Sequence, residues 1–280
     1  MIAQAFHSGR RVMCELFALS SDRPANVTFS LGVLGGRGGR LGPHKDGWGI
    51  AFKEGRDFRL IKEAAPASSS ACLRFIESHE FRSEIVISHI RLASLPRVNS
   101  YTNTHPFARE LYGACHVFAH NGNMPGVMAD SRLAPSWNLP LGETDSERAF
   151  CTLMDRLRHA LAPDEVFDLN KKLPVIQGWA SELAHHGMAN FLLSDSQYLY
   201  AHCSTRLFYI ERQCAAPHET FGSPTLRIAL SPVQDGARHV SLIATEPLTT
   251  DEAWISLPPG EVAVFQHGRR LFASRNPTGD

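Results

Sequence analysis

Two short segments carry the residue types best suited to covalent chemistry. Cys14 directly follows Met13, and a chain that began at Cys14 would carry a free α-amino group on this cysteine. Such a residue holds a thiol nucleophile and an amine base on one Cα, and the amine titrates at about pH 7.7–8.0, close to working pH. Farther along the chain, the pair Asn121 and Gly122 offers hydrogen-bond donors for a tetrahedral oxyanion.

Both segments also have a purely structural interpretation. A lone cysteine near a terminus is more often a buried core residue than a nucleophile. An Asn-Gly pair is more often a tight turn than an oxyanion hole. A chemical role for Cys14 therefore depends on the other polar segments of the chain.

The composition excludes several classes of function. The 280 residues are 43% hydrophobic, which is enough for a sizeable core, and 28 basic residues balance 28 acidic ones. This balance argues against nucleic acid or an acidic membrane as the main partner. No apolar run approaches the roughly 18 residues of a membrane span. Six scattered cysteines without a CxxC pair favour a reducing, cytoplasmic location.

Fourteen histidines raise the question of a metal site. His116 and His120 have the four-residue spacing of helical zinc ligands, but residues 114–120 have the pattern of a strand. In a strand these two side chains would lie about 13 Å apart. We therefore expect neither a metal ion nor another cofactor.

The hydrophobic pattern predicts strands toward both ends of the chain and helices between them. Strands are predicted at residues 14–20, 47–53, 58–62, 84–90, 114–120, 189–193, 198–203, 207–211, 240–245, 262–265 and 269–273, and helices after 68–70 and at 146–161 and 174–186. The simplest architecture is a single domain, residues 14–273, of two sheets with helices outside. Residues 1–13 would be a dispensable or removed leader, and residues 274–280 a tail.

Four further segments are polar where a plain core would be apolar: residues 42–50 (GPHKDGWGI), 89–94 (HIRLAS), 103–107 (NTHPF) and 142–147 (GETDSE). Arg91, at the end of an apolar strand, could hold a carboxylate through two parallel hydrogen bonds or form a structural ion pair. Asp145 or Thr144 is placed to cap the helix that follows, and such a cap does not exclude a ligand role for Asp145.

In this order, and behind a Met-Cys start, these segments resemble the class II glutamine amidotransferases of the N-terminal-nucleophile (Ntn) hydrolase type. The resemblance runs from Cys14 to about Gly268. It is closest to the short standalone bacterial members, which share the Met-Cys-Glu-Leu start and the Asp-Gly-Trp-Gly motif. It implies an α+β fold, the four-layer α-β-β-α sandwich with two mainly antiparallel sheets.

The resemblance also implies a role for each matching residue. Cys14 would attack the side-chain amide of glutamine and form a γ-glutamyl thioester, with its own freed amine as base. The other implied roles are an oxyanion hole from the Asn121 side chain and the Gly122 N–H, a carboxylate site at Arg91 with Ser94 nearby, an ammonium site at Asp145, and a pocket shaped by His105 and Asn103. Independently of the family, a zwitterionic substrate end requires one fixed cation and one fixed anion, and Arg91 and Asp145 supply both.

Three questions stay open at this level. Residues 1–13, if retained, would block the α-amine of Cys14, so we expect a start at Met13 or proteolytic processing. The chain has no room for an acceptor domain, so the ammonia would be released or passed to a separate synthase subunit. The substrate would be glutamine or another γ-glutamyl amide, such as a thiol-metabolite precursor or a peptide. A non-catalytic regulatory subunit of the same fold is the remaining interpretation.

The segment from Gly126 to Leu141 lies between the Asn-Gly pair and Asp145 in the sequence. We expect a loop here, with Trp137 placed to close over the leaving group as a lid or to pack as a satellite core.

Overall fold

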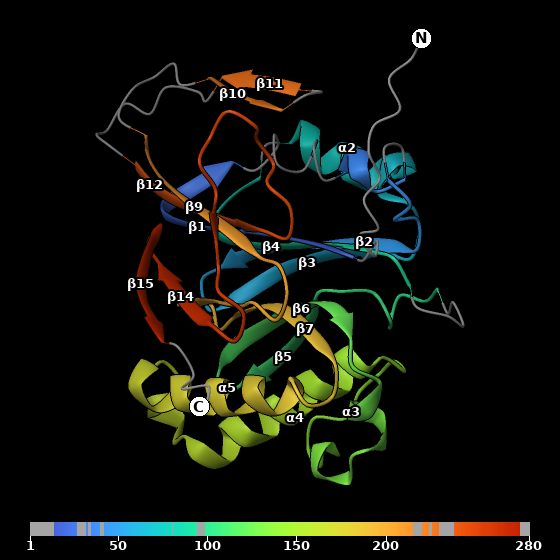
Figure 1. The fold of residues 1–280 in the computed structure, drawn as a ribbon, viewed down its shortest axis with the longest axis vertical. Coiled ribbons are helices and arrows are strands. Elements are labelled where there is room, and N and C mark those ends of the chain that lie inside the picture. Colours follow the sequence, from blue (N-terminus) through green and yellow to red (C-terminus); the bar gives the residue numbers. More distant parts are fainter. Residues whose placement is uncertain are drawn as a thin grey trace.

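Two stacked antiparallel sheets dominate the computed structural model, which describes residues 14–26, 32, 35–39, 42–79, 81–93, 99–214, 220–223, 226–229 and 238–274 (Figure 1). The first sheet has seven strands in the order β13-β9-β12-β1-β4-β2-β3. Their bounds are β1 Glu15–Asn26, β2 Gly47–Glu54, β3 Asp57–Glu63, β4 Arg82–Arg91, β9 Phe208–Cys214, β12 Arg238–Ala244 and β13 Ile255–Ser256.

The second sheet has six strands in the order β15-β14-β8-β7-β6-β5. Their bounds are β5 Phe107–Leu111, β6 Ala114–Asn123, β7 Met188–Ser194, β8 Leu199–His202, β14 Val262–Gln266 and β15 Arg269–Ser274. A separate pair is formed by β10 (Thr220–Ser223) and β11 (Leu226–Ala229).

Helices cover the outer faces of both sheets (Figure 1). Helix α2 (Ala71–Ser78) lies on the seven-stranded sheet, and α4 (Asp145–Ala160) and α5 (Leu169–Leu183) lie on the six-stranded one. The short elements are α3 (Pro125–Ala129) and the 3₁₀ turns η1 (Ala67–Ser69), η2 (Ser131–Leu133) and η3 (Pro163–Glu165). The result is the α+β, four-layer α-β-β-α sandwich that the family resemblance implies, and it confirms the two sheets with helices outside that the sequence pattern predicts. Among the described helices, none is long and apolar enough to cross a membrane.

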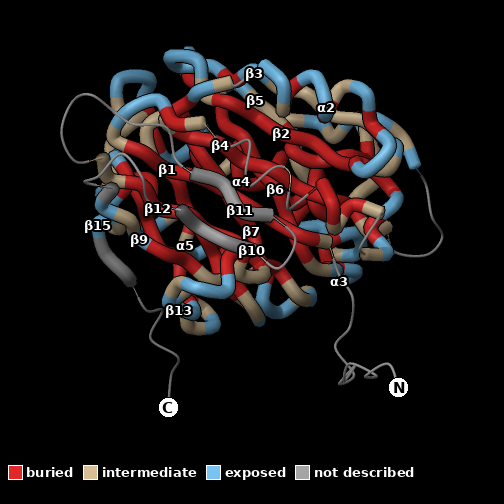
Figure 2. The backbone as a smooth tube through the Cα atoms, turned by 90° about the horizontal axis from the view of Figure 1, so that it is seen from above, coloured by how far each residue is buried: buried red, intermediate tan, exposed pale blue. Residues whose placement is uncertain are grey.

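Strand alternation explains how the layers pack. Leu16 and Ala18 of β1 point between the sheets, where they pack with Val117 and Ala119 of β6, while Phe17 points to the opposite face under α2. The buried residues follow the strands of both sheets and the exposed ones follow the outer loops and helix surfaces (Figure 2).

Two helix starts agree with their sequence signals. The Ser70 hydroxyl accepts a hydrogen bond from Leu73 N (2.9 Å) at the start of α2, and Thr144 Oγ1 accepts one from Glu147 N (3.1 Å) at the start of α4. Both side chains satisfy backbone donors that the first helical turn leaves free.

Helix α5 begins five residues earlier than the sequence pattern predicts. Asp168 caps it by accepting hydrogen bonds from Asn170 N (2.9 Å) and Lys171 N (3.3 Å). Pro174, where the sequence pattern predicts the helix to begin, lies inside it instead. An N-cap aspartate therefore marks the start more reliably here than the proline does.

Candidate active site

Cys14 lies at one end of the space between the two sheets. It immediately precedes β1 and stands two residues before Leu16, so strand alternation places its thiol on the face between the sheets. Leu92 N donates a hydrogen bond to Cys14 Sγ (3.2 Å), and the thiol donates to the Leu92 carbonyl oxygen (3.3 Å). From the other sheet, Asn121 Nδ2 donates to the carbonyl oxygen of Cys14. The fold thus brings together two candidate residues that are 107 positions apart.

The surroundings of the thiol keep it protonated. Burial raises the pKa of Cys14 to about 11, although the Leu92 hydrogen bond and the Arg91 charge act in the opposite direction. A thiolate, not a thiol, is the attacking species. Among the described residues, no imidazole or carboxylate accepts a hydrogen bond from this thiol. A base for Cys14 therefore has to come from outside these side chains.

Arg91 ends β4 beside the cysteine, and a small polar network holds its guanidinium. Arg91 Nη1 donates to the Asp46 carbonyl oxygen (3.4 Å) and to Asn99 Oδ1 (3.3 Å). The Asp46 carboxylate accepts hydrogen bonds from Ala93 N (2.8 Å) and Asn99 Nδ2 (3.3 Å). Asp46 and Asn99 therefore hold both Arg91 and the segment that contacts Cys14. The predicted site residue Ser94 lies outside the described residues.

The Asp-Gly-Trp-Gly motif contributes the charge of Asp46, and its second glycine leaves space for a neighbouring segment. A Cβ built on Gly49 would lie 2.2 Å from the His105 carbonyl oxygen and 2.9 Å from Pro106 Cδ. Only a glycine lets the segment at His105 pass this closely over β2. The motif therefore positions the 103–107 segment against the seven-stranded sheet.

His105 is packed rather than presented to the thiol. Its ring lies 4.4 Å from that of His89 and 4.4 Å from that of Phe107, measured between centroids. Burial lowers the pKa values of His89 and His105 well below the usual range, so both imidazoles are neutral. His105 therefore packs against His89 and Phe107, and its role in a substrate pocket stays a prediction.

Gly122 follows Asn121 at the end of β6, in a conformation with φ of +153°. A Cβ at this position would lie 1.8 Å from the Met188 carbonyl oxygen, a contact no side chain could relieve. The backbone here can approach its neighbours only because residue 122 is a glycine.

Asp145 opens α4 next to the same end of β6. Its Oδ2 accepts a hydrogen bond from Met124 N (2.6 Å), and its Oδ1 accepts from Ser146 N (2.7 Å). The Ser146 hydroxyl lies 2.8 Å from His120 Nδ1, and His120 Nε2 donates to the Met188 carbonyl oxygen (3.0 Å). Asp145 is therefore fixed to the end of the strand that carries Asn121.

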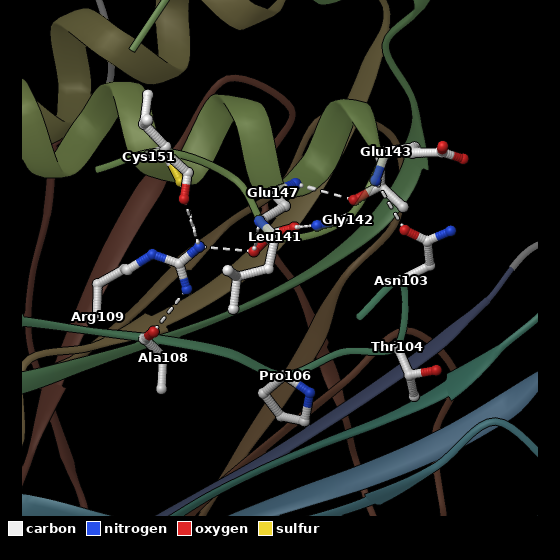
Figure 3. A network of polar contacts seen from close by, with 12 residues as sticks. Asn103, Thr104, Pro106, Ala108, Arg109, Leu141, Gly142, Glu143, Glu147 and Cys151 are labelled. Carbon is white, nitrogen blue, oxygen red and sulfur yellow. Dashed lines mark hydrogen bonds and ion pairs between the residues drawn. The ribbon is translucent and has the colours of Figure 1, made fainter. Parts of the chain in front are cut away.

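A second buried network holds the segment that leads into α4 (Figure 3). The Glu147 carboxylate, 1% exposed, accepts hydrogen bonds from Arg109 Nη2 (2.6 Å), Leu141 N (3.0 Å) and Gly142 N (2.7 Å). Asn103 Oδ1 accepts a hydrogen bond from the N–H of Glu143 (2.8 Å). These contacts link Asn103 of the pocket segment to the residues just before Asp145.

Of the two arrangements expected for Trp137, a lid or a packed satellite, the contacts of its segment favour packing against α4. Residues 125–133 form α3 and η2, and the N–H groups of Ser136 (2.5 Å), Trp137 (3.1 Å) and Asn138 (3.0 Å) donate to the Asp155 carboxylate. Asp155 lies ten residues beyond Asp145, about 15 Å along α4 at 1.5 Å per residue. Arg158 covers the Trp137 ring at 3.7 Å. This segment is thus anchored to α4 at Asp155.

Within the part of the chain that the structure describes, one group of side chains places potential metal ligands close together. Ligand atoms of Asp130, Glu182 and His186 fall within 4.8 Å of one another. Arg132 binds Asp130 (2.6 Å) and Arg156 binds Glu182 (2.5 Å). Each carboxylate of this group is thus already paired with an arginine.

Sequence reasoning missed three residues that support the site. Asp46 stands in a motif that the sequence singles out, but nothing there links it to Arg91. Asn99 follows the HIRLAS segment without a recognisable signal. Asn190 lies opposite Asn121 in the neighbouring strand and donates to its side-chain oxygen (3.1 Å). It is a lone amide in an apolar strand, and this break in the pattern is the one local signal that could have found it.

Comparisons with known proteins agree with this architecture. A family model described as "Glutamine amidotransferases class-II" matches residues 13–279. YafJ of Escherichia coli K12, whose glutamine amidotransferase name is itself provisional, is 39% identical over 261 residues, covering 92% of this chain and 100% of YafJ.

Solved structures show the same similarity. One is the crystal structure of a predicted glutamine amidotransferase from Pseudomonas aeruginosa PA01. It has a TM-score of 0.67 and 33% sequence identity, and the match covers 93% of this chain and 99% of that one. The glutamine PRPP amidotransferase of B. subtilis has a TM-score of 0.57 at 14% identity, covering 94% of this chain and 49% of that one, and shares the fold. The chain belongs to the class II glutamine amidotransferases.

Proposed function

We propose that this protein hydrolyses the side-chain amide of glutamine, with Cys14 as an N-terminal nucleophile. The observation that carries the proposal is the meeting of the Cys14 thiol, the Asn121 amide and the Arg91 end of β4 at one end of the inter-sheet space. Removal of residues 1–13, which the proposal requires, would free an α-amine on the Cα of Cys14. That amine is the base that the surrounding side chains do not supply.

The reaction has two steps. The Cys14 thiol gives its proton to the α-amine, and sulfur attacks the δ-carbon of the substrate amide to form a tetrahedral oxyanion. Asn121 Nδ2 and the Gly122 N–H donate to that oxygen. The amine then protonates the departing nitrogen, the C–N bond breaks, and ammonia leaves a γ-glutamyl thioester. Water attacks the thioester, and glutamate and the free thiol result.

The amino-acid end of the substrate is assigned to two charged residues. Arg91 would bind the α-carboxylate through two N–H donors, and Asp145 would bind the α-ammonium group. The support is their placement: Arg91 adjoins the Leu92 contact of Cys14, and Asp145 is hydrogen-bonded to the end of the Asn121 strand. Ser94 would lie beside the carboxylate, and His105 and Asn103 would line the pocket.

The same proposal covers the organisation of the chain. Residues 14–273 would form the amidotransferase domain, and any ammonia acceptor would be a separate subunit. The match to YafJ, which extends over 100% of that protein and 92% of this one, supports the assignment of residues 14–273 to one domain. The five cysteines whose side chains the structure describes are free thiols, which suits the proposed cytoplasmic location.

The test combines the natural N-terminus with turnover. Intact-mass measurement of natively expressed protein should find a chain that begins at Cys14, and this protein should release glutamate and ammonia from glutamine. Cys14→Ala should abolish release, while Cys72→Ala, at another half-buried thiol outside the site, should keep it. Fully active protein that retains Met1 would refute the free-amine mechanism.

A substrate panel decides between glutamine and other γ-glutamyl amides. Glutamine, γ-glutamyl peptides and γ-glutamyl thiol metabolites are ranked by kcat/KM. If kcat/KM for a bulky γ-glutamyl amide exceeded that for glutamine by more than roughly 10²-fold, the bulky amide would be the substrate instead of glutamine. Such a ratio requires dedicated contacts to the leaving group. No turnover of any member by protein with a free Cys14 would favour the regulatory subunit.

A further inference from the structure

A buried asparagine in β7, Asn190, contacts the proposed oxyanion donor Asn121 from the neighbouring strand. Asn190 is fully buried, and its Nδ2 donates hydrogen bonds to Asn121 Oδ1 (3.1 Å) and to the Asn121 carbonyl oxygen (3.3 Å). Strands β6 and β7 pair with Asn121 directly opposite Asn190. The neighbours of this pair on the same face, Ala119 and Leu192, are apolar. Two adjacent amides in such a face need a specific partner for each of their polar atoms.

The other side of Asn190 fixes which way its amide points. Its Oδ1 accepts hydrogen bonds from the backbone N–H groups of Ser204 (2.9 Å), Thr205 (2.9 Å) and Arg206 (3.2 Å). Backbone N–H groups only donate, so the atom that faces all three must be the oxygen. The amide nitrogen of Asn190 consequently faces Asn121, and it also donates to Thr205 Oγ1 (2.9 Å).

This orientation is passed on to Asn121. A donor at Asn190 Nδ2 requires an acceptor opposite it, which is Asn121 Oδ1. The Nδ2 of Asn121 is then left on the other side, where it faces Cys14. If the Asn121 amide turned over, its oxygen would face the developing oxyanion and repel it, while two N–H donors would face each other at Asn190.

We propose that Asn190 is a positioning residue that holds the Asn121 amide with its N–H group toward Cys14. The inference rests on the proposed function, in which Asn121 Nδ2 stabilises the oxyanion. It extends the site from β6 to the segment 204–206, whose three N–H groups set the orientation of Asn190.

The test variant is Asn190→Asp. It retains the size of the side chain and an oxygen for the three backbone donors, but it replaces the nitrogen that faces Asn121. We expect kcat to fall roughly 10²–10³-fold, as after loss of one oxyanion donor, with KM little changed. The matched control is Tyr200→Phe, which removes a buried hydrogen bond to Asp195 (3.0 Å) from the same sheet. It should lower the melting temperature and leave kcat unchanged.

A double variant separates positioning from a merely structural role. Because Asn190 acts through Asn121, Asn190→Asp should cost no further kcat in an Asn121→Ala background. Independent, multiplying losses in the double variant would overturn the proposal, as would unchanged kcat in Asn190→Asp alone.

A second readout does not depend on turnover. The side-chain NH₂ resonances of Asn121, assigned by their loss in Asn121→Ala, should shift in Asn190→Asp and stay in place in Tyr200→Phe. Resonances that do not move in Asn190→Asp would refute the positioning role. Wild-type protein that turned over no γ-glutamyl amide would refute the proposed function instead, and the resonances would still decide on Asn190.

Discussion

The protonation state of Cys14 gives the sharpest prediction, because the structure sets its magnitude. Burial raises the pKa of this thiol to about 11 in the chain that retains residues 1–13. At pH 8 about 0.1% of it would be thiolate, against about 24% for a free cysteine of pKa ~8.5. The more basic thiolate is intrinsically about 10–18 times more reactive, for a Brønsted slope of ~0.4–0.5. The two effects leave Cys14 about 20-fold slower than an ordinary thiol.

The assay is alkylation by iodoacetamide, followed by mass spectrometry of the peptide that contains Cys14. The comparison is the same protein unfolded in guanidinium chloride. In the folded chain the rate should rise about tenfold per pH unit up to about pH 11, whereas the unfolded chain should level off near pH 8.5. Half-maximal alkylation of the folded chain near pH 8.5 would refute the argument from burial.

The same measurement tests the role of the leader. In a chain that begins at Cys14, the protonated α-amine lies beside the thiol and lowers its pKa, because an adjacent positive charge favours the thiolate. Alkylation at pH 7–8 should therefore be faster than in the chain that retains residues 1–13. Equal alkylation rates in the two proteins would show that the α-amine does not activate the Cys14 thiol.

Three further predictions concern substitutions. Asn121→Ala should lower kcat for glutamine by roughly 10²–10³-fold with little change in KM, and an unchanged kcat would exclude Asn121 from the oxyanion hole. Arg91→Lys and Asp145→Asn should weaken discrimination against des-carboxy and des-amino analogues respectively, measured as ratios of kcat/KM; wild-type ratios would contradict the charge assignment. Lys172→Met should lower the free energy of unfolding, measured with denaturant, by about 3–5 kcal/mol. The substitution leaves the Asp195 carboxylate buried without the Lys172 ammonium that binds it at 2.5 Å. A loss under about 1 kcal/mol would contradict this prediction.

The buried pair also predicts the pH dependence of stability. Burial disfavours the Asp195 carboxylate, but the Lys172 charge, together with the hydrogen bonds that Asp195 accepts, more than offsets this and lowers the pKa of Asp195 below its usual range. A carboxyl group with a lowered folded-state pKa binds more protons in the unfolded chain. Its stabilising contribution is therefore present at neutral pH and lost as the pH falls below about 4. Asp195→Asn should remove this acid-dependent part of the unfolding free energy.

The local sequence determines those features that depend on neighbours along the chain. Alternating apolar residues predict β1, β4 and β6, since the period of a strand is a property of consecutive residues. Ser70 and Thr144 mark helix starts, because a cap binds N–H groups only two or three positions away. The order of the polar segments behind Cys14 also indicates the family, which the similarity to known proteins confirms.

The tertiary structure alone decides which distant residues meet. Asp46 holds the Arg91 segment and Asn190 faces Asn121, through hydrogen bonds that span 47 and 69 positions and leave no periodic trace in the sequence. Trp137 stands close to Asp145 in the sequence, yet its N–H binds the Asp155 carboxylate, ten residues farther along α4. Satisfying buried backbone donors outweighs proximity along the chain. The strands and helices that carry the candidate residues could thus be predicted from the sequence. The orientation of the Asn121 amide and the placement of the 125–141 segment required the packed fold.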